Sequence, residues 1–281
     1  RELRGLQAAE FLYEKRLFPD LQYTFKHALT HEVAYGGLLQ ERRRELHARL
    51  VGAIESLHRD RLGEQVERLA HHARHGAVWD KAVPYLRQAG LKAAGRCALP
   101  EARGWLEEAL GVLAGLPESP ATLEQGVDIR LQLRPLLGVL GEYRAVMERL
   151  REAEVIAETL NDDRRRGRVW AVMTNAHSQL GQLDEALPLG MRALAAAARS
   201  GDLPLRLLTT TYLEQASYFG GDFQRAVELA VGNLAALPAG SEYESFGAAM
   251  PIAIYDRYLL VRGLAQLGRF DEAPRYEAEG L

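Results

Sequence analysis

The stretch Val169–Ala193, with the sequence VWAVMTNAHSQLGQLDEALPLGMRA, is the clearest indication of the fold. Its first half spaces apolar side chains as one face of a helix does, and these are Trp170, Met173, Ala176 and Leu180. Gly181 follows, and glycine readily takes the positive φ that ends a helix. The second half carries small residues on one helix face, namely Ala186, Gly190 and Ala193. The stretch therefore predicts two helices that are joined by a tight turn and packed closely.

The same pattern occurs again along the chain. Pairs of small or compact side chains seven residues apart stand at Ala82/Ala89, Ala102/Ala109, Val146/Ala153, Ala186/Ala193, Ala226/Asn233 and Ala273/Gly280. A turn signature, glycine followed two residues later by Tyr, Leu or Phe, precedes the last four pairs and begins at Gly141, Gly181, Gly221 and Gly268. The period of about 40 to 47 residues indicates a helical-hairpin repeat. Stacked helix pairs offer an extended surface to partners and seldom gather catalytic groups in one pocket.

Composition narrows the possible functions. The chain has 281 residues, 47% of them hydrophobic and 26% charged, and its net charge of -3 gives no overall attraction to nucleic acid or to an anionic membrane. One cysteine, Cys97, excludes an internal disulfide and is typical of a reducing compartment. No stretch reaches the roughly 18 apolar residues of a membrane helix. Because the start has neither a signal core nor an initiating Met, we expect a cytoplasmic chain that was cut from a longer protein.

Two single residues carry further expectations. Cys97 stands where other repeats have their turn glycine, and we expect a small buried thiol there. Pro251 is expected inside a helix, which it should kink.

The first sixty residues have a different pattern. A short amphipathic helix is predicted over Gly5–Glu14 and a short strand over Leu21–Phe25, with a hairpin turn at residues 16–20. A helix over His27–Tyr35 should stop at the following glycines, and a long helix is predicted over Leu38–His58. Its apolar side is expected to consist of Leu46, Leu50, Ile54 and Leu57.

Several stretches here resemble a known family. They are YTFKHALTHEVAY at residues 23–35, LLQERRRELH at 38–47, LAHHA at 69–73 and YLRQAG at 85–90. They are similar to bacterial signalling ATPases of the STAND type, above all to those in which a class III adenylate or guanylate cyclase domain precedes the ATPase. In that family a tetratricopeptide-like array follows the ATPase. The resemblance extends over nearly the whole chain, and it is specific over the first ninety residues and generic beyond them.

The resemblance implies an architecture. Residues 1–60 would be the C-terminal part of a winged-helix domain with one β-hairpin, and residues 61–281 an all-α, tetratricopeptide-like superhelix of helical hairpins, an α–α solenoid. The ATPase domain of the same protein would be a partner in cis, and ATP or ADP would bind there, outside this chain. In STAND proteins a histidine at the strand-to-helix junction of the winged helix touches the β-phosphate of ADP. His27 matches that position, although Ala28 replaces an acidic residue of the family's motif.

Other motifs are weaker. His71 with His75, and His27 with His31, have the i, i+4 spacing of metal ligands, but no third ligand stands at a zinc-site spacing, so no metal is expected. The basic triplets Arg42–Arg44 and Arg164–Arg166 adjoin acidic residues and are expected to form local ion pairs on solvated helices. The chain has no phosphate-binding loop of the form Gly-x-x-x-x-Gly-Lys-(Ser/Thr) and no recognisable nucleophile motif, so we expect no catalysis in it.

Three hypotheses about function remain. The first is a non-catalytic interaction and regulatory region that couples a protein or peptide partner on the array to an attached ATPase, in a protein that can also carry a cyclase. The second is the sensor array of a STAND-type transcription regulator. The third is a free-standing tetratricopeptide scaffold without a link to nucleotides. The domains that flank the chain would discriminate between them.

Overall fold

The computed structural model describes residues 2–16 and 22–278, and not the side chains of residues 2, 16, 22, 277 and 278. Within these residues the chain forms fourteen α-helices, one 3-10 helix and a single two-stranded sheet. The predicted all-α class is confirmed. The chain separates into two compact units, residues 1–89, called unit 1, and residues 90–281, called unit 2. The predicted domain boundary at residue 60 stays a prediction.

Unit 1 begins with a short helix and the β-hairpin. The elements are α1 (Glu2–Ala8), β1 (Leu12–Arg16) and β2 (Gln22–Phe25), and the strands pair antiparallel with Leu12 opposite Phe25. The hairpin was predicted, but the predicted helix through Glu14 is wrong. It ends at Ala8 because Glu10 takes a positive φ of 60° and the Phe11 N–H donates to the Leu6 carbonyl, which closes the helix. Most of the predicted turn, residues 17–20, lies outside the described residues.

Unit 1 continues with helices. They are α2 (Ala28–Gly36), α3 (Gln40–Leu57), the 3-10 helix η1 (Arg59–Glu64) and α4 (Val66–His75). The predicted apolar side of α3 is confirmed at Ile54 and wrong at Leu50 and Leu57. Leu50 and Leu57 are exposed, whereas α3 buries His47, Val51 and Ile54. The buried side is shifted by about one residue because α4 packs on α3 there.

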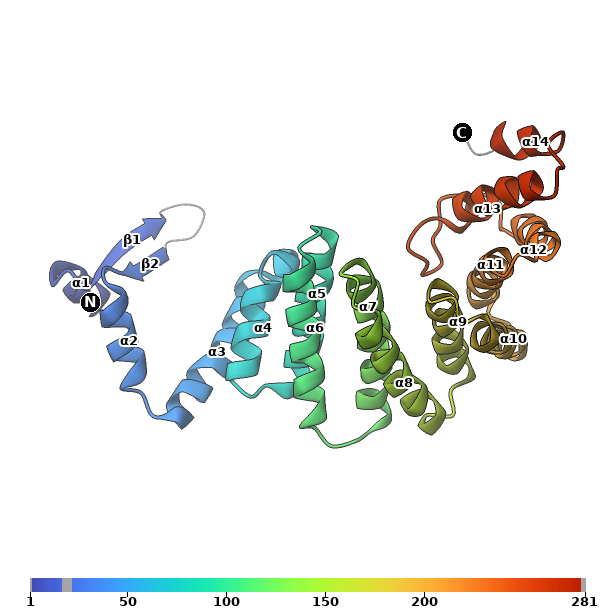
Figure 1. The fold of residues 1–281 in the computed structure, drawn as a ribbon. Coiled ribbons are helices and arrows are strands. Elements are labelled where there is room, and N and C mark those ends of the chain that lie inside the picture. The colour runs from blue at the N-terminus through green and yellow to red at the C-terminus, as the bar shows by residue number, and fades with distance from the viewer. Residues whose placement is uncertain (1, 17–21, 279–281) are drawn as a thin grey trace. The chain divides into compact units, whose positions relative to one another are not determined.

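Unit 2 consists of stacked helix pairs (Figure 1). The helix α5 (Trp79–Gly95) crosses the border between the units. The others are α6 (Leu99–Ala114), α7 (Pro120–Val139), α8 (Tyr143–Thr159), α9 (Asp163–Gln179), α10 (Leu183–Ser200), α11 (Leu203–Phe219), α12 (Phe223–Ala235), α13 (Ile252–Gln266) and α14 (Ala273–Ala278).

The turn glycines behave as predicted. Gly141, Gly181, Gly221 and Gly268 take φ of 75°, 72°, 80° and 72°. Each connects two helices through a position that side chains with a Cβ disfavour. Cys97 takes the same conformation with φ 57°, as its place in the repeat suggests, but the expected burial of its thiol is wrong, because Cys97 is exposed. The αL residue at such a turn faces solvent.

The small residues provide close helix contacts. The first five predicted pairs are buried, whereas Gly280 of the sixth lies outside the described residues. At Gly190 of α10 an added Cβ would lie 2.4 Å from a methyl carbon of Leu213 on α11. The two helices can therefore approach this closely only because position 190 has no side chain.

The predicted position of Pro251 inside a helix is wrong. Pro251 precedes the first residue of α13 and its φ is -54°, which a proline ring adopts at a helix start. Residues 236–251 consequently form one long connection, which we call the α12–α13 loop. Among the described residues no helix has both the length and the apolar character required to cross a lipid bilayer.

Candidate ligand-binding face of the inner helices

Two helices of unit 2, α9 and α11, are enclosed by their neighbours. The helix α9 contacts α7, α8, α10 and α11, and α11 contacts α9, α10, α12 and α13. We call α9 and α11 the inner helices. Because they are enclosed, they bury polar side chains as well as apolar ones, and the polar ones are Thr174, Asn175, His177, Ser178, Thr209, Thr211, Glu214, Gln215 and Ser217. Buried polar groups normally have hydrogen-bond partners, so those without one are candidate binding groups.

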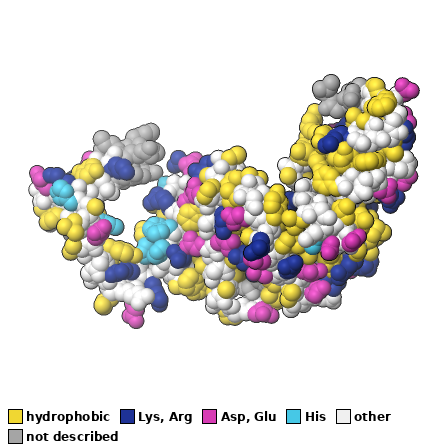
Figure 2. All heavy atoms as spheres, in the orientation of Figure 1, with side chains coloured by type: hydrophobic (Ala, Val, Ile, Leu, Met, Phe, Trp, Pro, Cys, Tyr) yellow, Lys and Arg dark blue, Asp and Glu magenta, His cyan; other side chains and the backbone are white. Residues whose placement is uncertain are grey.

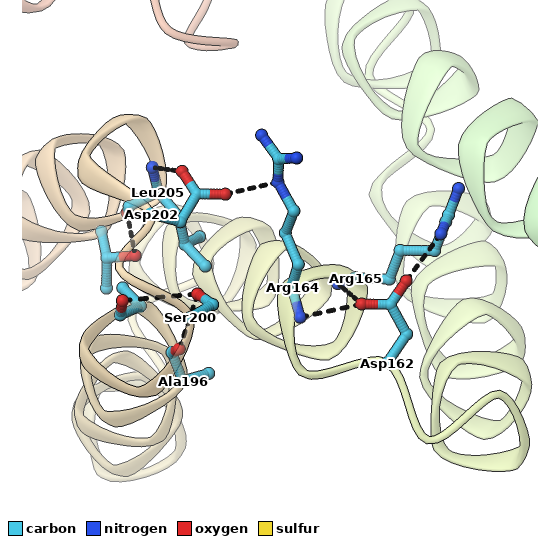
Figure 3. A network of polar contacts seen from close by, with 9 residues as sticks. Asp162, Arg164, Arg165, Ala196, Ser200, Asp202 and Leu205 are labelled. Atoms are coloured by element: carbon cyan, nitrogen blue, oxygen red, sulfur yellow. Dashed lines mark hydrogen bonds and ion pairs between the residues drawn. The ribbon is translucent and has the colours of Figure 1, made fainter.

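Aspartates cap both inner helices at their start. Asp162 accepts hydrogen bonds from the backbone N–H groups of Arg164 and Arg165, and Asp202 accepts one from that of Leu205. The Arg164 side chain reaches from α9 to the start of α11, where its Nε lies 2.5 Å from the Asp202 carboxylate (Figure 3). The caps satisfy N–H groups that a helix leaves unpaired, and they fix where each inner helix begins.

One amide pair connects the inner helices. Asn175 Nδ2 on α9 donates to Gln215 Oε1 on α11 at 2.6 Å, and both side chains are buried. Nothing among the described residues pairs with the remaining Asn175 Oδ1 or with Gln215 Nε2. A buried polar group without a partner costs about 1 to 3 kcal/mol. A peptide backbone offers one N–H and one C=O per residue, which are the groups that these two atoms lack.

Asn175 also faces an open pocket formed by α7, α8 and α9. Its empty volume is about 620 Å³, including space open to solvent. Arg134 and Gln179 supply polar groups, and most other lining residues are apolar: Pro135, Gly138, Val139, Tyr143, Val146, Ala176 and Ala249. Apolar walls with a few polar groups are typical of ligand sites.

The α12–α13 loop lies against this face. Its Ala249 lines the pocket of Asn175, and its Phe246 lines a smaller pocket with Arg168 of α9. The backbone at Gly247 is so close to Arg168 that a Cβ there would lie 2.3 Å from Nη2. Phe246 and Gly247 both take positive φ, of 49° and 94°. The loop therefore covers part of the inner-helix face with its own backbone.

Two carboxyl groups are buried beside the same face. Asp256 on α13 accepts hydrogen bonds from Thr211 Oγ1 at 2.8 Å and from Asn233 Nδ2 at 2.7 Å. Burial raises the pKa of Asp256 to about 6, and burial together with the nearby Asp256 raises the pKa of Glu214 well above its usual range. The Glu214 oxygens have no hydrogen-bond partner among the described residues, so burial and the neighbouring Asp256 carboxyl both favour the protonated form of Glu214.

His27, the predicted site residue, lies in unit 1. It directly precedes α2, between β2 and that helix, at the strand-to-helix junction where the resemblance expected it. Its side chain is exposed and forms no capping hydrogen bond, while its carbonyl accepts from the Thr30 and His31 N–H groups. The phosphate-sensing role stays a prediction.

The basic triplets form ion pairs, as expected. In the first, Arg42 pairs with Glu45 at 2.5 Å. In the second, Arg165 pairs with Asp162 at 2.6 Å, and Arg166 pairs with Asp163. These pairs are local, whereas Arg164 of the second triplet pairs with Asp202 at the start of α11.

Sequence reasoning missed Asn175 and Gln215, although a signal was present. Each stands six residues before a turn glycine, Gly181 and Gly221 respectively (181 - 175 = 6; 221 - 215 = 6). Amide side chains at the same place in successive repeats lie side by side once the repeats stack.

The fold is that of tetratricopeptide-like repeats, and several solved structures have the same fold. BtubC of P. vanneervenii superposes with a TM-score of 0.59 at 18% identity, over 86% of this chain and 90% of that one. NprR in complex with its cognate peptide NprX gives 0.56 at 13% identity, over 90% and 69%. A STAND protein with a tetratricopeptide repeat sensor from Pyrococcus horikoshii gives 0.54 at 16% identity, over 99% and 45%.

Sequence comparison finds a partial match. An uncharacterized protein of Rhizobium meliloti strain 1021 is 31% identical over 146 residues. The match covers 52% of this chain but only 14% of that protein. No family model matches the chain.

Proposed function

We propose that the chain is a non-catalytic regulatory region that binds a peptide or an extended protein segment on its inner helices. The observation that carries this proposal is the Asn175–Gln215 pair, which leaves one buried acceptor and one buried donor without a partner among the described residues, and whose Asn175 lines a pocket. Arg134 in the same pocket favours a segment with a carboxylate.

The likeness to NprR supports this proposal by analogy of fold, since that protein was solved with its cognate peptide. The α12–α13 loop supports it as well. The loop presents backbone to Arg168 and places Ala249 in the pocket, so the face already accepts a polypeptide segment. A partner would compete with this loop.

The test is to pan a displayed random dodecapeptide library against a variant in which residues 242–249 are Gly and Ser at unchanged length. We expect selected peptides to bind this variant and to lose about tenfold in affinity when Asn175→Ala is added, measured by fluorescence anisotropy. The matched control is Gln224→Ala, which removes an exposed amide on α12 and should change nothing. Peptides indifferent to Asn175→Ala, or a library without binders, would contradict the proposal.

We further propose that ligand binding to this chain regulates an ATPase domain of the same protein, which binds ATP or ADP. The whole protein would then resemble the STAND ATPases that carry a cyclase domain. The support is the likeness to the Pyrococcus horikoshii STAND protein and the apolar surface near His27. Leu29, Val33 and Leu39 are exposed on and after α2, where a further domain could cover them. His27 would there contact the phosphate of ADP.

This part has its own test. In a protein that carries both the ATPase domain and this chain, His27→Ala should speed the release of a fluorescent ADP analogue, whereas His58→Ala should not. An unchanged release rate for His27→Ala would remove the sensing role. The chain by itself should show no ATP or ADP binding in calorimetry, and micromolar binding would place the nucleotide site here instead.

A further inference from the structure

Four histidines of unit 1 gather at the contact of two helices. His47 comes from α3, and His71, His72 and His75 come from α4. The ring centroid of His47 lies 5.7, 5.0 and 5.3 Å from those of His71, His72 and His75, respectively. Figure 2 shows histidine side chains gathered at the surface in the region of these helices.

The ring nitrogens of this cluster are oriented by hydrogen bonds. His47 Nδ1 and His72 Nδ1 lie 2.8 Å apart, so at most one of them carries the proton between them. His47 Nε2 lies 2.9 Å from the Tyr35 hydroxyl oxygen. His75 Nδ1 lies 2.8 Å from the His71 carbonyl oxygen, to which it can only donate, and its Nε2 therefore keeps a lone pair.

We propose that His47, His71 and His72 bind a zinc ion that joins α3 to α4. One nitrogen from each of the three rings lies within 4.8 Å of the other two. Zinc bound to imidazole at about 2.0 to 2.1 Å in tetrahedral geometry separates its ligand atoms by about 3.3 Å, so the three nitrogens would draw closer together when the ion binds. The ion would replace the proton between the two Nδ1 atoms, and the fourth position would go to His75 Nε2 or to water.

The surroundings suit a metal ligand. A metal-bound histidine usually donates its other ring N–H to an oxygen, which fixes the ring, and the Tyr35 oxygen is placed to accept from His47 Nε2. His47 is also buried, which limits its ring to few orientations.

The sequence-based expectation of no metal depended on a missing third ligand. His71 and His75 lie one turn apart on α4, and no cysteine or carboxylate follows them at a zinc-site spacing. The fold supplies the third ligand from 24 residues upstream (71 - 47 = 24) by packing α3 on α4.

The experiment uses the full chain without an affinity tag, stripped of metal by a chelator and titrated with zinc chloride in a calorimeter. We expect one zinc per chain and a higher melting temperature for unit 1, because a ligand that binds only the folded state stabilises it. Cobalt chloride should give the visible absorption of tetrahedral Co²⁺. His71→Gln, an exposed position that should fold normally, is expected to lower zinc affinity at least tenfold, and so is His47→Gln.

Two further variants sharpen the result. Tyr35→Phe removes the acceptor for His47 Nε2–H and should weaken zinc binding about tenfold. His58→Gln, outside the cluster, should bind zinc like the parent. The proposal fails if no heat and no thermal shift accompany zinc, or if His47→Gln keeps the parental affinity, since binding would then use α4 alone.

Discussion

The helices α2 and α11 both contain apolar residues at helical spacing, yet they differ in what surrounds them. None of the nine residues of α2 is buried, whereas α11 buries twelve of its seventeen. Four helices contact α11, while β2 is the chief contact of α2. An apolar stripe on a helix is therefore stable where another element covers it, and neighbouring helices cover the stripe of α11 but not that of α2. The repeats of unit 2 are held by their own packing, and α2 offers apolar surface for something else to cover.

The same substitution in both helices should show the difference between them most clearly. Leu207→Ala on α11 removes a fully buried side chain and should cost about 2 to 5 kcal/mol of unfolding free energy. Leu29→Ala on α2, where the side chain is 69% exposed, should change it by less than about 0.5 kcal/mol. Urea denaturation followed by circular dichroism measures both, and equal losses would mean that α2 is packed after all.

The close helix contacts of unit 2 should resist larger side chains. Ala193→Phe on α10 overpacks a fully buried position and should cost about 1 to 3 kcal/mol, seen as a lower melting temperature. Ala195→Phe, two residues along the same helix and exposed, is the matched control. If both variants melt like the parent, residue 193 does not face a neighbouring helix.

The buried carboxyl pair should make unit 2 sensitive to pH. The folded-state pKa of Asp256, about 6, exceeds its ordinary value of 3.8, so its contribution is complete below about pH 4 and is lost as the pH rises through 6. Glu214, whose pKa is also raised, acts in the same direction. We expect a loss of about 1 to 2 kcal/mol between pH 5 and pH 8. Glu214→Gln should flatten this profile and be more stable than the parent at pH 8, and parallel profiles would mean that Glu214 does not contribute to the pH dependence.

The aspartate caps should contribute the smallest of these effects. Asp202→Ala leaves the Leu205 N–H at the start of α11 without its acceptor and should cost about 1 kcal/mol. Arg164→Ala removes only the ion pair to Asp202 from an arginine that is 73% exposed, and should cost less than about 0.5 kcal/mol. Thermal unfolding of the two variants compares the contribution of the helix cap with that of the ion pair. A larger loss of stability for Arg164→Ala than for Asp202→Ala would contradict the expectation that the cap contributes more.

Local rules were enough to predict the repeat. Each turn glycine is required because its backbone takes a positive φ, and each pair of small residues is required because one neighbouring helix packs closely against it. Both requirements depend on a few nearby residues, so a short window of sequence is enough to recognise them. The same reasoning failed for α3, where Leu50 and Val51 compete for the buried side and α4 decides in favour of Val51. It failed at Pro251 because proline is equally compatible with a helix start and with a kink.

The candidate sites were harder to predict, since each combines residues from different helices. Asn175 and Gln215 are 40 residues apart and become a pair only when two repeats stack. The Glu214–Asp256 pair likewise needs α13 beside α11. His27 was found through the resemblance alone, and its position at the start of α2 agrees with that prediction without testing its role.

The exposed thiol at residue 97 has a practical consequence. Because the chain has one cysteine, a maleimide dye or a nitroxide reacts at a single defined point, the turn between α5 and α6. A second label on an introduced cysteine would then report, by energy transfer or by spin–spin distance, how far that turn moves when a peptide is added. The parent sequence needs no cysteine removed first.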